Sequence, residues 1–188
     1  LYANITELLG WQLFNINIEG MLHFNNFGLL FNTVAFSCTL LYFLLNGRDI
    51  EKVGHNVSEY FALIFFVLCG VAISTSFKSL LMLFLGIEIM SIPLYILTGS
   101  DKRNLKGNEA ALKYFLMVAF STGSMLMGIT FIYGGSTIGT FNIDMIELVT
   151  GNMPIVISVG MVSLLVAKSF KVSAVPFHCD NTEVYDGA

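Results

Sequence analysis

Residues 80–97 read LLMLFLGIEIMSIPLYIL, an apolar run that carries a single carboxylate, Glu88, near its middle. Together with Ser79 the run is long enough, at the rise of an α-helix, to cross most of the hydrocarbon of a bilayer. An acidic side chain at that depth costs roughly 2.5–3.5 kcal/mol on insertion scales, so it is rarely present without a task. The pattern favours an ion or proton site. The alternative is a protonated or paired carboxyl that only holds helices together.

The composition indicates a membrane protein. The chain has 188 residues, of which 55% are hydrophobic and 12% charged, whereas soluble domains are about a quarter charged. The net charge of −4 gives no reason to expect nucleic acid as a partner. The three cysteines, Cys38, Cys69 and Cys179, have no metal or redox spacing. Because the first two lie in apolar runs, we expect them to be small core residues.

Four further apolar segments accompany the Glu88 run, and they predict an all-α integral membrane protein with about five transmembrane helices. The segment 1–26 is too interrupted to span and is expected at the surface, and residues 27–188 are expected to form the membrane domain. The segment 1–26 also lacks Lys and Arg, which argues against a signal peptide or a mitochondrial presequence. The last helix is expected to break near Pro176. The predicted spans are 27–45, 60–77, 79–97, 110–133 and 153–175.

Small and kink-forming residues predict two local features of these spans. Gly123, Ser124 and Gly128 are small enough to let a neighbouring helix approach closely. Pro93 should loosen its helix one turn past Glu88, because it leaves a backbone carbonyl without its helical donor. Beside a buried carboxylate, such a kink can admit water.

Three lysines lie in the predicted spans together with Glu88. Charged residues are costly in a bilayer, so one acid with three bases indicates a function beyond simply spanning the membrane. Lys113 lies early in its predicted helix, where it can snorkel to the surface or pair with Glu109 one turn before it. Lys168 and Lys171 are three residues apart, so we expect them to share a helix face. Two close ammonium groups suit a lysine that must release a proton. The alternative is two lysines that snorkel near the helix end.

His178 follows the expected break at Pro176. A titratable imidazole in an unwound membrane segment can continue a proton path, although a lone histidine is more often structural. The sequence shows no Gly-rich phosphate loop, no paired metal ligands and no nucleophile beside a base. We therefore expect no catalytic residue, no metal site and no cofactor bound by this chain.

Three motifs, taken together, resemble a known family. They read LFLGIEIMSIPLYIL, EAALKYF and SFKVSAVPFH, and the last is followed by EVYDGA. Their order and spacing are similar to those of the antiporter-like subunits of NADH-quinone oxidoreductase, respiratory complex I. Multisubunit cation/proton antiporters share the glutamate motif. The VYDGA ending is nearer the subunit N branch, which in mitochondria is NADH dehydrogenase subunit 2.

This resemblance implies a fold of two inverted five-helix repeats, of which the chain holds roughly one, each with a discontinuous helix and a proton half-channel. Glu88 matches the family's key glutamate, Lys171 the lysine before the helix break, Lys113 the lysine of the EAxxKY motif, and His178 the histidine of the break. Lys168 has no counterpart in the family pattern. The Trp and Pro that usually follow the break are replaced in the segment that ends at Glu183.

The implied function is that of a non-redox membrane-arm subunit of a proton-pumping NADH:ubiquinone oxidoreductase, without catalysis by this chain alone. NADH, flavin, iron–sulfur clusters and quinone would then be bound elsewhere in the complex. The implied partners are other membrane-arm subunits, the lipid bilayer and a second chain that supplies the C-terminal half. The expected location is the mitochondrial inner membrane, with a bacterial plasma membrane as the alternative. A scaffold that no longer pumps and a cation/proton antiporter subunit are the alternative functions.

Overall fold

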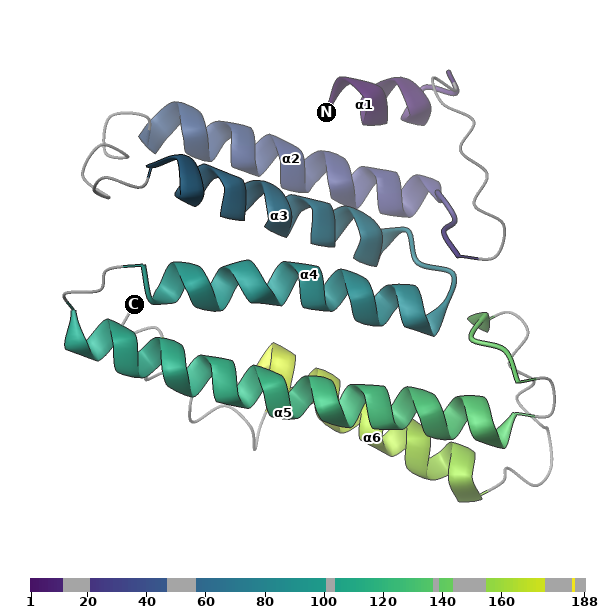
Figure 1. The fold of residues 1–188 in the computed structure, drawn as a ribbon. Coiled ribbons are helices and arrows are strands. Elements are labelled where there is room, and N and C mark those ends of the chain that lie inside the picture. Colours follow the sequence, from purple (N-terminus) through teal and green to yellow (C-terminus); the bar gives the residue numbers. More distant parts are fainter. Residues whose placement is uncertain are drawn as a thin grey trace. The chain divides into compact units, whose positions relative to one another are not determined.

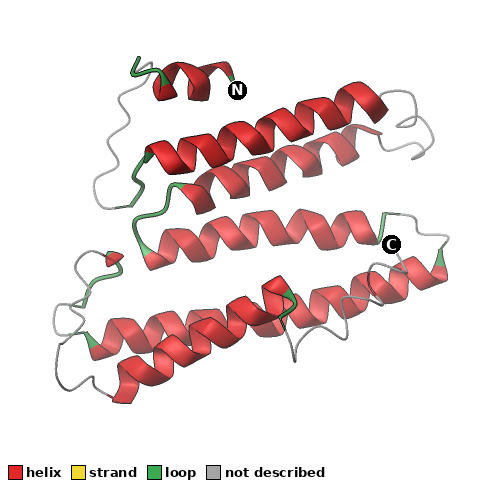
Figure 2. Ribbon diagram, turned by 180° about the vertical axis from the view of Figure 1, so that it is seen from behind, coloured by secondary structure: helices red, strands yellow, loops and turns green. Residues whose placement is uncertain are grey.

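The computed structural model describes residues 1–11, 21–46, 57–100, 104–136, 139–143, 155–174 and 184, and these form helices with short connections (Figure 1). The helices are α1 (Tyr2–Leu8), α2 (Asn26–Asn46), α3 (Val57–Thr75), α4 (Leu80–Thr98), α5 (Leu105–Gly135) and α6 (Ile155–Val172). No strand occurs among the described residues (Figure 2), and an isolated antiparallel bridge joins Leu22 and Phe77.

Five of these helices, α2 to α6, are long and apolar enough to cross a membrane. The chain is therefore a multi-pass α-helical membrane protein, as the sequence predicts. Each helix lies within a few residues of its predicted span, with two informative differences. α5 begins five residues before the predicted start at Ala110, and α6 ends at Val172, three residues before the predicted end. The division into a surface segment and a membrane domain stays a prediction.

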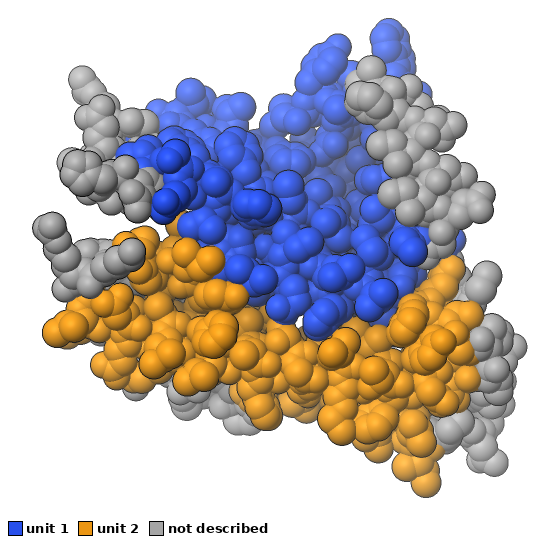
Figure 3. All heavy atoms as spheres, in the orientation of Figure 1, with its two compact units in different colours: residues 1–93 blue, residues 94–188 orange. Residues whose placement is uncertain are grey.

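The chain folds as two compact units, residues 1–93 and 94–188, which are coloured separately in Figure 3. The division falls within α4, directly after Pro93. α4 continues as a helix through Pro93, although the proline cannot donate a hydrogen bond to the carbonyl four residues earlier. Ser91, in the same stretch, donates its hydroxyl to the carbonyl of Ile87 at 2.6 Å.

In the first unit, α2 and α3 are joined by a small-residue contact and a polar one. A Cβ atom added to Gly28 would lie 2.8 Å from the carbonyl oxygen of Thr75, so the two backbones approach more closely than larger side chains allow. The hydroxyl of Thr75 donates a 2.9 Å hydrogen bond to the Oδ1 atom of Asn32, which is 4% exposed. Such interhelical bonds stabilise membrane helix pairs by about 0.6 kcal/mol on average.

Glycines also bring α3 and α4 together. A Cβ atom on Gly70 would lie 2.6 Å from the backbone nitrogen of Met90, and one on Gly86 would lie 2.8 Å from the backbone nitrogen of Ser74. Since glycine offers no side chain at these two positions, the two helix backbones come into direct contact. This contact defines the face of α4 that is turned toward α3.

In the second unit, α5 and α6 pack antiparallel along a seam of small residues. Gly128 faces Gly160, and Gly135 faces Ile157. Ser124 donates to the carbonyl of Ser163, one turn closer to the start of α5. The expectation of a close approach is confirmed for Ser124 and Gly128. It is wrong for Gly123, because a Cβ atom there would meet nothing within 4 Å.

The expectation that Cys38 and Cys69 are core residues is wrong in this structure, because both are exposed. An apolar run in a soluble protein signals burial in the core. In a membrane span, lipid accepts apolar side chains on any face, so hydrophobicity alone does not distinguish a lipid-facing cysteine from a packed one.

Candidate functional site

Glu88 lies on the side of α4 that is turned away from α3. The α3-facing positions are Gly86 and Met90, and Glu88 is two residues from each, about 200° around the helix. The side chain is half-buried, and its Oε1 atom is buried. The structure therefore partly shields Glu88, the acidic residue of the predicted proton site, from its surroundings within the first unit.

Lys113 lies deeper in its helix than the sequence suggested. α5 begins at Leu105, where the side chain of Asn104 caps the helix by accepting a 3.1 Å hydrogen bond from the backbone N–H of Lys106. Lys113 is consequently the ninth residue of α5, about 12 Å from its start. Its ammonium group pairs with Glu109 at 3.0 Å, one of the two alternatives that the sequence left open, and the two side chains are 44% and 67% exposed. A pair this exposed contributes little stability.

The end of α6 is a distinct structural feature close to Lys171. Ser173 has a φ of 56°, in the left-handed region. The N–H of Ser173 bonds to the carbonyl of Phe170, and the N–H of Ala174 bonds to the carbonyl of Ser169. This is the Schellman arrangement that closes helices, here with serine where glycine is usual. The helix therefore stops one residue after Lys171, before Pro176 in the sequence. His178 lies outside the described residues.

α6 ends beside the middle of α5 rather than at its end, as both ribbon views show (Figures 1 and 2). Ser121, the seventeenth of the 31 residues of α5, donates a 2.8 Å hydrogen bond to the carbonyl of Ala167 in the penultimate turn of α6. Lys171 is one turn further on. Its position is therefore opposite the middle of a long membrane helix, and the last carbonyls of α6 are there as well.

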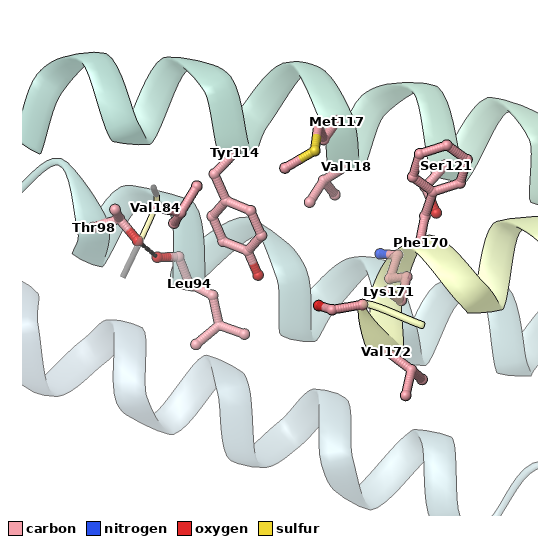
Figure 4. Close-up of a pocket in the computed structure, with 11 residues that line it drawn as sticks. Leu94, Thr98, Tyr114, Met117, Val118, Ser121, Phe170, Lys171, Val172 and Val184 are labelled. Carbon is pink, nitrogen blue, oxygen red and sulfur yellow. Dashed lines mark hydrogen bonds between the residues drawn. The ribbon is translucent and has the colours of Figure 1, made fainter. Parts of the chain in front are cut away.

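A cavity of about 290 Å³ lies at this helix end, within the second unit (Figure 4). The ammonium group of Lys171 and the hydroxyl of Tyr114 both point into it. The cavity has room for several water molecules, each of which takes about 30 Å³ in the liquid. The described residues that line it are Leu94, Thr98, Tyr114, Met117, Val118, Ser121, Phe170, Lys171, Val172, Ser173 and Val184.

The cavity separates the two neighbouring lysines of α6. Lys171 is half-buried and lines the cavity, whereas Lys168 is exposed and is not among the described lining residues. Sequence reasoning had placed both on one helix face. It also missed Tyr114 as a lining residue, although this tyrosine directly follows Lys113 and is a polar side chain in an apolar span.

A lysine and a phenol that share a cavity large enough for water are groups that can bind and release protons. Among the described residues, no group of three or more His, Cys, Asp and Glu side chains is placed to hold a metal ion. The fold and the site thus define a class: a helical membrane protein that carries titratable side chains at a helix end within the spans.

Comparison with known proteins identifies the family. Residues 77–188 match the family model described as "NADH:quinone oxidoreductase/Mrp antiporter, TM". The chain belongs to this family. The matched region includes Glu88 and all three lysines of the spans.

Individual relatives carry the name of one subunit. NADH-quinone oxidoreductase subunit N of Cytophaga hutchinsonii is 42% identical over 169 residues, which are 90% of this chain and 36% of that protein. Subunit N of Trichlorobacter lovleyi is 32% identical over 188 residues, 99% of this chain and 39% of that protein. The chain thus spans little more than a third of the length of these curated relatives.

Solved structures show the same fold. A chain of respiratory complex I from Thermus thermophilus is 26% identical, with a TM-score of 0.71 over 98% of this chain and 39% of that chain. A chain of the membrane-bound sulfane sulfur reductase, an archaeal respiratory membrane complex, has a TM-score of 0.84 over the same shares at 21% identity. The second likeness concerns the fold alone.

Proposed function

We propose that this chain contributes a proton half-channel to a membrane-arm subunit of a proton-pumping NADH:quinone oxidoreductase. The observation that carries the proposal is the position of Lys171: the side chain leaves the last turn of α6 and enters a cavity that it shares with Tyr114. The subunit N names of the relatives support the assignment to this enzyme complex.

In this proposal, Lys171 is the group that gains and loses the proton. Burial favours the neutral form of a lysine and a nearby negative charge favours the charged form, so a change in a neighbouring charge can move a proton on or off. Water in the cavity would connect the ammonium group with the hydroxyl of Tyr114. Chemistry of NADH and quinone is assigned to other subunits, and this chain contributes no redox group.

Glu88 and Lys113 are proposed as further members of the proton path, together with His178. Glu88 is an acid in a predominantly apolar span and has a buried oxygen atom. Lys113 already has a carboxylate partner in Glu109, which is compatible with a charge that shifts between states. Lys168 has weaker support, because it is exposed and does not line the cavity of Lys171.

The proposed partners are other membrane-arm subunits, and a further polypeptide segment that corresponds to the rest of subunit N. The second partner rests on the share of the relatives that this chain matches, 36% to 39%. The relatives named above are bacterial, which favours a bacterial plasma membrane over the mitochondrial inner membrane.

The test compares the two lysines of α6 in membrane vesicles that contain the assembled complex. Lys171→Ala should abolish most NADH-driven proton uptake, measured with a pH-sensitive dye, while the complex remains assembled on native gels. Lys168→Ala is the matched control, on the same helix one turn earlier, and should have a much smaller effect. Normal proton uptake in an assembled Lys171→Ala complex would reject the half-channel and favour the scaffold alternative.

A cation/proton antiporter is the second candidate function, because the family description covers both kinds of complex. The two are separated by the same vesicles. Proton movement that requires NADH and stops with an inhibitor of NADH oxidation supports the first function. Proton movement driven by an imposed Na⁺ gradient in the absence of NADH supports the second.

A further inference from the structure

The hydroxyl group of Ser121 is bonded to the carbonyl at which the last turn of α6, the turn that carries Lys171, begins. Ser121 is 1% exposed, and its Oγ atom donates a 2.8 Å hydrogen bond to the carbonyl oxygen of Ala167, which is itself 0% exposed. In an α-helix the same carbonyl accepts the N–H group four residues later, which here belongs to Lys171. Ser121 and Lys171 are therefore connected through one carbonyl oxygen.

The last turn of α6 is expected to open more readily than the body of the helix. It is the last turn before Ser173, whose left-handed backbone is unfavourable for a residue with a side chain. Helix ends open more readily than helix interiors, since fewer hydrogen bonds hold them. A buried hydrogen bond from α5 fixes the Ala167 carbonyl, and with it the start of this last turn, against α5. It also acts beside the cavity, because Ser121 and Lys171 both line it.

We propose that Ser121 is a positioning residue for Lys171: its hydrogen bond to the Ala167 carbonyl holds the start of the last turn of α6 against α5, so that the Lys171 ammonium group stays in the cavity. The inference rests on the proposed function of Lys171. Ser121 itself exchanges no proton in this scheme.

Ser124 provides a matched control on the same seam. Its hydroxyl also donates to a backbone carbonyl of α6, that of Ser163, at the longer distance of 3.4 Å. Ser163 is two turns before Lys171, in the body of the helix. Loss of the Ser124 hydroxyl therefore removes a similar interhelical bond without touching the turn that carries the lysine.

The experiment compares Ser121→Ala and Ser124→Ala in the assembled membrane complex. Hydrogen exchange of the backbone amides 169–174 should become about three- to tenfold faster in Ser121→Ala, as expected for the loss of one hydrogen bond. Ser124→Ala should leave these amides unchanged. In vesicles, Ser121→Ala should lower the number of protons moved per NADH while the rate of NADH oxidation is retained. A merely structural weakening would lower the amount of complex and leave that ratio unchanged.

Lys171→Ala, measured in parallel, separates failure of this inference from failure of the proposed function. Unchanged proton yield in Lys171→Ala rejects the function of the lysine. A lowered yield in Lys171→Ala together with equal behaviour of Ser121→Ala and Ser124→Ala overturns the role of Ser121 alone. If Ser121→Ala does not assemble, Ser121→Thr and Ser121→Cys replace it. The threonine hydroxyl should keep the normal proton yield and the weakly donating thiol should lower it, and equal yields would overturn the inference.

Discussion

Gly128 of α5 and Gly160 of α6 lie against each other's backbone. A Cβ atom added to Gly128 would be 2.8 Å from the carbonyl oxygen of Gly160, and one added to Gly160 would be 2.9 Å from the carbonyl oxygen of Gly128. Neither position can accept a larger side chain unless the helices move apart. This contact aligns the two helices and so determines which part of α5 faces Lys171.

Gly128→Val is therefore expected to lower the free energy of unfolding by about 1–3 kcal/mol through overpacking. The measurement is denaturant unfolding of the chain in detergent. Gly123→Val is the control on the same helix, since a Cβ atom there meets nothing within 4 Å, and it should change the stability by less than about 0.5 kcal/mol. Equal losses of unfolding free energy in the two variants would contradict the close packing of α5 on α6 at Gly128.

Thr75→Val is expected to weaken the contact between α2 and α3. It removes the hydroxyl that donates to Asn32 and leaves the buried amide oxygen with one donor fewer, at a cost of about 0.6–1.7 kcal/mol. Unfolding in detergent again measures the effect. Thr39→Val removes a hydroxyl that bonds to Ala35 of its own helix at 2.8 Å, so a loss as large as that of Thr75→Val would show that the interhelical bond is not the cause.

Ser173→Gly is expected to stabilise the end of α6. Replacing Ser173 by glycine relieves the left-handed strain, which costs a residue with a side chain about 1–2 kcal/mol. The greater freedom of glycine in the unfolded chain offsets about 0.5–1 kcal/mol of this stabilisation. The net gain should be about 0.5–1 kcal/mol. Ser169→Gly, one turn earlier in the regular helix, should instead lose about 0.5 kcal/mol. Stability changes of opposite sign for the two variants in thermal unfolding would confirm the left-handed backbone at Ser173, and changes of equal sign would contradict it.

Glu88→Gln should reduce NADH-driven proton uptake by more than half in an assembled complex, because the amide cannot change its charge and so cannot alter the proton affinity of the lysines. The vesicle assay with a pH-sensitive dye measures this, with the amount of complex on native gels as the control for assembly. Full assembly together with normal proton uptake would remove Glu88 from the proton path.

The helices themselves could be predicted from the sequence, because membrane spans need long apolar runs and these are easily recognised. The helix ends could not be predicted as well. α5 begins at Leu105, where the side chain of the preceding Asn104 caps a polar turn that hydropathy does not detect. α6 ends at Val172 because Ser173, the next residue, has a left-handed backbone, for which the surrounding sequence gives no signal.

The candidate site was predicted only in part. The sequence pointed to Glu88, Lys113, Lys168 and Lys171 because charged residues are costly in apolar spans. It also offered the ion pair between Lys113 and Glu109 as one of two alternatives. It could not separate Lys168 from Lys171, since three residues apart on a helix means nearly the same face. Their different surroundings follow from the packing of α5 beside the end of α6. The same packing brings in Tyr114 and Ser121, which no charge pattern indicated.

By itself, then, the sequence determined that the chain is a membrane protein, roughly where its helices lie and which ionisable groups fall within the apolar spans. Hydrophobicity and charge are properties of local segments, so these features can be read from the order of residues. Only the tertiary structure decided that α6 stops beside the middle of α5, at a cavity that receives Lys171 and not Lys168. That outcome depends on contacts between residues far apart in the sequence, such as Ser121 with Ala167, 46 residues away, and no local pattern specifies them.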